Sequence, residues 1–108
     1  MPLLINVDPQ PTFVSLHLEG EVDSKSAPEL LDALTQLALA ELAELRIHVV
    51  QLTFMSSAGL RALVFAKQKM PHSSRLVLVG GSPEIREVIE RTGLGSAVMM
   101  VATVSELD

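Results

Sequence analysis

The 108-residue sequence contains no cysteine, no tryptophan and no tyrosine. Without cysteine there are no disulfide bonds, thiol nucleophiles or thiolate metal ligands, as is typical of a reducing compartment. Aromatic residues make up only 3% of the chain and apolar residues 48%, so the core must be mainly aliphatic. No apolar run approaches the roughly eighteen residues of a membrane span, and MPLLINVDPQ lacks the basic flank of a signal peptide. We therefore expect one soluble, cytoplasmic domain over residues 1–108 that does not insert into a membrane.

Acidic residues are also missing from one long internal segment. The net charge of −5 argues against general binding to nucleic acid. No aspartate or glutamate occurs between Leu45 and Pro83, whereas the segment contains five basic residues: Arg46, Arg61, Lys67, Lys69 and Arg75. This asymmetry suggests a locally positive face for an acidic partner or a phosphate. For Lys67 and Lys69 alone, an ordinary solvated helix face is the simpler interpretation.

Hydrophobic periodicity predicts alternating strands and helices. Strands are predicted at 2–7, 12–20, 45–55, 74–81 and 97–104, and helices at 26–42, 58–70 and 82–95. Alternation of this kind implies parallel pairing through helical crossovers, after an opening hairpin that is antiparallel. The expected fold is α/β, a mixed sheet of four or five strands packed against three or four helices.

Local signals mark where the helices begin and which face each one buries. Ser26 followed by Glu29 is a capping-box pattern, so the first helix should begin near Ser26. Its apolar stripe is predicted to consist of Leu30, Leu31, Leu34, Leu37 and Ala38. Ser82 is the expected N-cap of the third helix, with Pro83 in its first turn and glycines at its end. Gly20 and Gly80 are interpreted as turn residues.

The stretch FMSSAGLRAL, residues 54–63, lies where a buried strand gives way to the second helix. A hydroxyl at a helix N-terminus is well placed to carry a phosphate, because unpaired backbone N–H groups and the helix dipole favour an anion there. The alternative is a purely structural role for the serine, as the cap of the helix. Serine is among the best N-caps, and a cap contributes about 1 kcal/mol. The junction alone favours the cap.

Three segments resemble a known family in order and spacing. GEVD at 20–23, TFMSSAGLRAL at 53–63 and LVLVGGSPEIREVIERTGL at 76–94 are similar to a STAS domain of the anti-sigma factor antagonist type. The resemblance runs from Leu3 to Leu107. The family's central pattern resembles Phe-(Met/Ile/Leu)-Asp-Ser-(Ser/Thr)-Gly-Leu, which aligns with Phe54 to Leu60 of this chain, with Ser56 at the aspartate and Ala58 at the second serine or threonine.

The resemblance implies a non-catalytic, partner-switching regulator of transcription. Its partners would be an anti-sigma factor that is also a serine kinase, and a serine phosphatase. ATP and magnesium would belong to the kinase, so the resemblance implies no cofactor for this chain. Ser57 falls on the family's phosphorylated serine. Phosphorylation would add about 1.5 to 2 negative charges and break a close interface.

The resemblance also implies a set of partner-binding residues around Ser57: Asp23, Met55, Ser56, Ser57, Ala58, Gly59 and Arg61. Asp23 would orient the serine hydroxyl or contact the partner; equally, it is a carboxylate in the turn before the first helix. Gly59 is expected to permit close backbone approach, and Arg61 to face the partner, the phosphate or only solvent.

Three departures from the family pattern leave alternatives open. Ser56 stands where an aspartate is usual, so phosphorylation at Ser56, or none, is an alternative. His48 stands where the family's strand often carries an aspartate, and it is interpreted as a tolerated strand residue. The chain ends at TVSELD, where the family commonly continues into another helix, so that helix is expected to be short or missing.

Two other classes of function compete with the switch. A phosphorylation-independent STAS scaffold or regulatory protein-binding module is the alternative to the switch. An enzyme is disfavoured, because Met55 stands where a hydrolase elbow needs its first glycine, and His17, His48 and His72 show no spacing that makes one a base. These scattered histidines also predict no metal site.

Overall fold

The computed structural model describes residues 2–92 and 98–107. Its elements, in chain order, are β1 (Leu4–Pro9), β2 (Val14–Val22), α1 (Ala27–Thr35), η1 (Leu39–Glu41), β3 (Glu44–Met55), α2 (Ser57–Lys69), β4 (Arg75–Val79), α3 (Pro83–Arg91), β5 (Met99–Val101) and η3 (Val104–Leu107). The predicted order of strands and helices is confirmed. Gly93 and Gly95, expected at the end of the third helix, lie outside the described residues.

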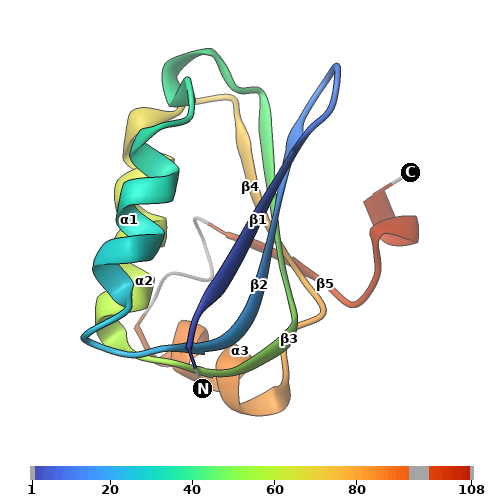
Figure 1. Cartoon of the computed structure of the whole chain (residues 1–108). Helices are drawn as coiled ribbons and strands as arrows, with labels where there is room; N and C mark the ends of the chain where they lie inside the picture. Colours follow the sequence, from blue (N-terminus) through green and yellow to red (C-terminus); the bar gives the residue numbers. More distant parts are fainter. Residues whose placement is uncertain (1, 93–97, 108) are drawn as a thin grey trace.

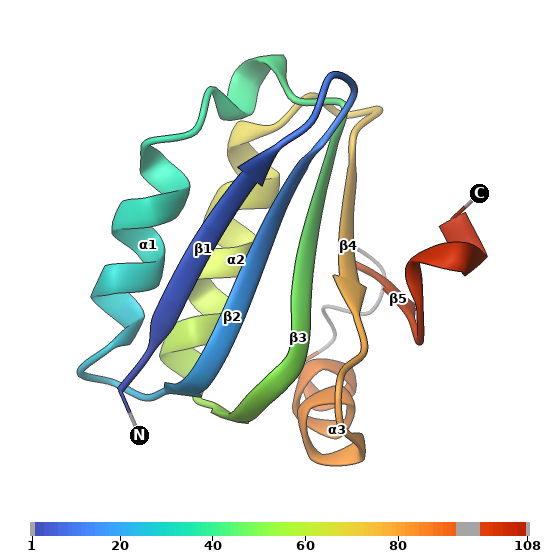
Figure 2. The same ribbon diagram turned by 45° about the vertical axis from the view of Figure 1, so that its right-hand side comes forward.

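The five strands form one sheet in the order β1-β2-β3-β4-β5. β1 and β2 form the antiparallel hairpin, and the remaining neighbours pair in parallel. Helices α1 and α2 lie side by side on one face of the sheet, and α3 lies near the end of β3 (Figures 1 and 2). This confirms the predicted mixed sheet with helical crossovers. Among the described residues, no helix is long and apolar enough to cross a membrane.

The core lies between the sheet and the helices α1 and α2. Alternate residues of β2 and β3, such as Leu16 and Ile47, are completely buried, as is Leu34 of α1. Each such aliphatic side chain contributes about 1.5 to 3 kcal/mol by leaving water. The core holds the carboxyl ends of β2 and β3 against the start of α2.

The first helix differs from its prediction in two respects. It begins at Ala27 as expected, but no capping box forms, because Ser26 has helical backbone angles (φ −95°, ψ −16°) instead of the extended ones a cap needs. The hydroxyl of Ser26 bonds within the preceding turn instead. The helix ends at Thr35, and Leu31 is 37% exposed, so the predicted stripe is too wide.

The two glycines expected in turns have different positions. Gly80 follows β4 with φ +78° and is a turn residue as predicted. Gly20 has φ +98° but lies inside β2 at a register shift against β3, so its assignment to a turn is wrong. A Cβ on Gly20 would be 2.2 Å from the carbonyl oxygen of Pro2, which explains the glycine.

The five basic residues of the acid-free segment do not form a common positive face. Arg46 and Arg75, on the sheet, both pair with Glu44. Partial burial of Glu44 opposes its ionisation, but hydrogen bonds from the two arginines lower the pKa of its carboxyl group below the usual value. The other three basic residues are on α2. The described end of the chain forms the 3₁₀ helix η3.

Candidate partner-binding site

The junction between β3 and α2 is built around Ser56. Its side-chain oxygen accepts a hydrogen bond from the backbone N–H of Gly59 (3.3 Å), so Ser56 is the N-cap of α2. Its own backbone N–H donates to the carbonyl of Val22 at the end of β2 (2.7 Å). Ser56 therefore fixes the start of the helix against the neighbouring strand, and its half-buried hydroxyl is engaged by the fold.

Ser57 occupies the first position of α2 and is exposed. Its hydroxyl makes no hydrogen bond to any residue that the structure describes. The first turn of α2 contains no acidic residue, so nothing in that turn repels an added anion. The unpaired N–H groups and the dipole of the helix favour a negative group at this position. The structure thus divides the two serines into a capping residue and a chemically available one.

Asp23 follows β2 at the same edge of the sheet, since Val22 pairs with Met55. Its Oδ1 accepts hydrogen bonds from the backbone N–H groups of Lys25 (2.9 Å) and Ser26 (2.9 Å) and from the Ser26 hydroxyl (3.0 Å). The pKa of the Asp23 carboxyl is lowered below its usual value, and the hydrogen bonds from Ser26 are the largest cause. Asp23 makes no described hydrogen bond to Ser57, so it acts first as the carboxylate of the turn before α1.

Two of the expected partner-binding residues lie beneath the surface. Met55 is 2% exposed, and Gly59 is buried where helix α2 approaches β2 most closely. A Cβ on Gly59 would be 2.7 Å from Cγ1 of Val22 and 3.0 Å from Cγ of Met55. Gly59 thus permits the close backbone approach that the sequence predicted. Neither residue contributes to the exposed surface, so a docking partner would touch their neighbours instead.

Ala58 and Arg61 lie on the rim of an apolar groove between α1 and α2. The groove has a volume of about 270 Å³ and is lined by Ser24, Ala27, Pro28, Leu31, Ala58, Arg61, Ala62 and Phe65. Sequence reasoning did not assign Leu31 and Phe65 to this surface. Adjacent leucines such as Leu30 and Leu31 are about 100° apart on a helix, so one of them must lie away from the core. The adjacent leucines were therefore the sequence signal that one of them faces away from the core.

The histidines lie away from the junction. His48 on β3 stacks against His17 on β2, with ring centroids 4.2 Å apart. Partial burial lowers the pKa of His48 below its usual value, and the charges of His17 and Arg46 lower it further. Seven residues separate His48 from Met55, which is about 23 Å along a strand. Among the described residues, no three metal-ligating side chains gather in a group.

Comparison with known proteins agrees with this geometry. The family model of the STAS domain matches residues 5–107, so the chain belongs to the STAS domain family. An anti-sigma-B factor antagonist from Listeria monocytogenes is 33% identical over 86 residues, covering 79% of this chain and 75% of that protein.

Solved structures share the fold. The crystal structure of an anti-sigma factor antagonist from Mycobacterium paratuberculosis has a TM-score of 0.86 at 23% identity. The alignment covers 96% of this chain and 89% of the Mycobacterium chain. The Bacillus cell fate determinant SpoIIAA, in its phosphorylated form, has a TM-score of 0.73 at 20% identity, covering 97% of both chains. Proteins of this type are regulatory and non-catalytic, which agrees with the expectation that this chain is not an enzyme.

Proposed function

We propose that the chain is an anti-sigma factor antagonist whose binding to an anti-sigma factor serine kinase is controlled by reversible phosphorylation of Ser57. The observation that carries this proposal is the exposed hydroxyl of Ser57 at the first position of α2, free of hydrogen bonds to the described residues. The name of the Listeria relative supports the antagonist role. The phosphorylated form of SpoIIAA, a protein of the same fold, supports the modification.

The substitution of Ser56 for the usual aspartate is compatible with this switch. Serine and aspartate are both among the best N-caps, and Ser56 supplies the capping oxygen to Gly59. Phosphorylation of Ser56 would esterify the hydroxyl oxygen that caps α2 and so disrupt the cap, whereas phosphorylation of Ser57 leaves the cap in place. The geometry therefore favours Ser57 over Ser56 as the modified residue.

A phosphate on Ser57 would act on the partner and leave the fold intact. An anion at the first helical position is stabilising, so α2 should remain folded. Arg61 is four residues further along the helix and exposed, within reach of the new charge on the same face. The added charge would oppose a partner seated over Asp23, Ser56, Ala58 and Arg61 through repulsion and desolvation. A serine phosphatase would restore binding.

The test is an affinity pull-down from the source cells with Ser57→Ala and Ser57→Asp in parallel, followed by mass spectrometry. We expect an anti-sigma factor kinase to be retained by the alanine form and lost by the aspartate form. Incubation of that kinase with ATP and magnesium should phosphorylate the wild-type protein but not Ser57→Ala. If both variants retain the same partner, the chain is a phosphorylation-independent scaffold.

The matched control is Ser73→Asp. Ser73 is also exposed but follows the far end of α2, about 20 Å from Ser57 for a helix of this length. The control adds the same charge to the same protein at a distance from the proposed interface. Loss of the partner in both aspartate variants would attribute the effect to net charge and contradict the role of Ser57.

A further inference from the structure

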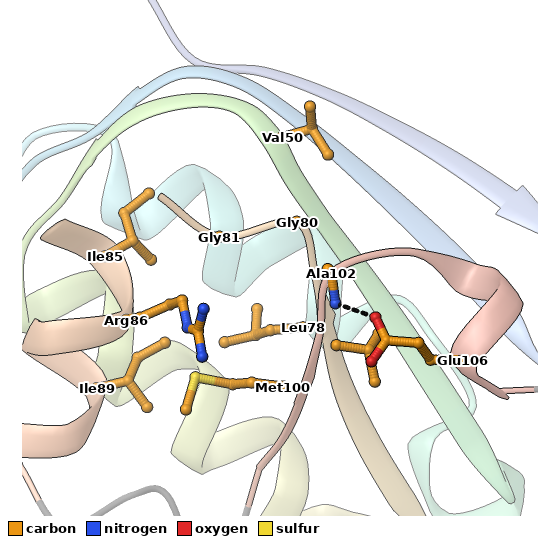
Figure 3. Close-up of a pocket in the computed structure, with 11 residues that line it drawn as sticks. Val50, Leu78, Gly80, Gly81, Ile85, Arg86, Ile89, Met100, Ala102 and Glu106 are labelled. Carbon is orange, nitrogen blue, oxygen red and sulfur yellow. Dashed lines mark hydrogen bonds between the residues drawn. The ribbon is translucent and has the colours of Figure 1, made fainter. Parts of the chain in front are cut away.

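A second strand-to-helix junction, between β4 and α3, borders a cavity of about 550 Å³. Its walls come from Val50 of β3, the end of β4, one side of α3, β5 and the 3₁₀ helix η3 (Figure 3). A volume of this size is within the range of small-molecule sites, which tend to lie beyond the carboxyl ends of parallel strands. The cavity is separate from the junction that contains Ser57.

The floor of the cavity is apolar. It is lined by Leu78, Ile85 and Ile89, each of which is at most 2% exposed, and by Met100 of β5. Figure 3 shows Ile85 and Ile89 projecting from α3 toward Leu78 and Met100 on the opposite side. An apolar body of a few carbon atoms could rest on these side chains and remove them from water.

One cation faces this apolar floor. The guanidinium group of Arg86 extends from α3 into the space between Ile85, Ile89 and Met100 (Figure 3). Arg86 forms no ion pair within residues 2–92 and 98–107. Arg91 on the same helix, by contrast, pairs with Glu87 (2.6 Å). A guanidinium offers a planar fork of N–H donors that matches a carboxylate or a phosphate, so Arg86 is the group that would select an anion.

The carboxylate that lines the same cavity is engaged by the backbone. Glu106 of η3 accepts hydrogen bonds at Oε2 from the N–H groups of Ala102 (2.6 Å) and Thr103 (3.0 Å). These bonds hold its charge at the β5 wall, across the cavity from α3 (Figure 3). The cavity therefore has a positive wall on α3 and a negative group fixed on the opposite side.

Two glycines at the end of β4 line the cavity. Gly80 has φ +78°, and its N–H donates to the carbonyl of Val101 (2.9 Å), which ties β4 to β5. A Cβ on Gly80 would be 2.2 Å from Cγ2 of Val50. A Cβ on Gly81 would be 3.4 Å from Cγ of Arg86, beside the stem of the arginine.

We propose that this cavity binds a small amphipathic anion. Its carboxylate or phosphate group would pair with Arg86, and its short apolar body would lie on Ile85, Ile89 and Met100. The proposal rests on the cavity alone and is independent of phosphorylation at Ser57. A partner-switching domain with such a site would respond to a small molecule as well as to a kinase.

The test is a titration of the ¹⁵N-labelled full chain, followed by NMR, with four probes of six carbon atoms each: hexanoate, hexyl phosphate, 1-hexanol and hexylamine. We expect the anions to shift the amide signals of Gly80, Gly81 and Met100, with the alcohol binding about tenfold more weakly and the amine more weakly still. The relative strength of the carboxylate and the phosphate identifies the head group. Equal binding of hexanol and the anions would overturn the proposal.

Two exposed arginines of the same helix provide the variant and its control. Arg86→Gln should weaken binding of the preferred anion about tenfold, whereas Arg91→Gln should leave it unchanged. Both side chains are exposed, and the melting temperature of each variant shows whether the fold survives. Unchanged affinity in Arg86→Gln, an equal loss in both variants, or shifts confined to the groove between α1 and α2 would each contradict the site.

Discussion

The chain passes from a parallel strand into a helix at two serine-capped junctions that differ in what they enclose. Ser56 caps α2 by accepting from Gly59 N–H, and Ser82 caps α3 by accepting from Ile85 N–H, both at 3.3 Å. Beyond the cap the similarity ends. The β3–α2 junction is closely packed at Gly59 and exposes Ser57, whereas the β4–α3 junction borders a cavity.

The glycines of the two junctions explain this difference. Gly59 lies inside its helix and lets α2 pack closely against Val22, where even a Cβ would not fit. Gly80 and Gly81 precede their helix, and no side chain from them fills the space between α3 and β5. A packed junction holds a surface group rigidly for a protein partner, and an open one admits a small molecule. The same cap thus supports two kinds of site.

The largest expected effect is on partner binding at the first junction. Ser57→Asp should weaken binding of the purified anti-sigma factor kinase about a hundredfold, about 2.8 kcal/mol, because it places a charge inside the interface. Ser82→Asp provides the comparison at the second junction, where aspartate is an equally good cap. Isothermal titration calorimetry should detect no change for Ser82→Asp. Equal losses in the two variants would erase the functional distinction between the junctions.

The next largest expected effect is on stability, and it tests how tightly Gly59 and Gly81 are packed. Gly59→Val should lower the free energy of unfolding by about 2 kcal/mol, because even its Cβ would overlap Val22. Gly81→Ala should change it by less than about 0.5 kcal/mol, because its Cβ would make contacts of 3.4 Å or more. Urea unfolding measures both. A larger loss in Gly81→Ala would mean that the second junction is the tighter one.

The two caps should be equivalent in stability. Ser56→Ala and Ser82→Ala should each lower the free energy of unfolding by about 1 kcal/mol, since each removes one acceptor from a helix N-terminus. The two sites share no hydrogen-bond partner, so the double variant should lose the sum. Urea titration of the three variants tests this. A large deviation from additivity would indicate that the junctions are coupled.

The smallest effect concerns the Asp23 turn beside the first junction. Because the folded-state pKa of Asp23 is lowered, its contribution to stability is present above the ordinary aspartate pKa and is lost as the pH falls through the folded value. Asp23→Asn should therefore be less stable than wild type at neutral pH and approach it in acid. Unfolding curves between pH 2 and pH 7 measure the gap. A gap that stays constant with pH would exclude the carboxylate as its source.

Much of the fold followed from local pattern. The alternation of β2, the buried run of β3 and the cap at Ser82 predicted elements that the structure contains. The errors arose where tertiary contacts override local signals. Ser26 fits a capping box but is drawn into the turn of Asp23, and Gly20 reads as a turn but relieves a close approach of Pro2 within a strand.

The candidate site was predictable only in part. The strand-to-helix position of Ser56 and Ser57 came from periodicity, and the family resemblance separated their roles. Leu31 and Phe65 escaped prediction as groove residues because a groove belongs to two helices at once, and neither helix's own pattern contains it. The cavity at Arg86 is of the same kind, because its walls come from β3, β4, α3, β5 and η3.

The sequence by itself determined the order of the elements, the aliphatic core and the serines at the starts of α2 and α3, because these depend on neighbours a few residues apart. Only the tertiary structure decided that Ser56 is the cap and Ser57 the available hydroxyl, that Met55 is buried, and that one junction is closely packed at Gly59 while the other borders a cavity. Those outcomes depend on which side chains from distant segments, such as Val22 against Gly59, occupy the same space.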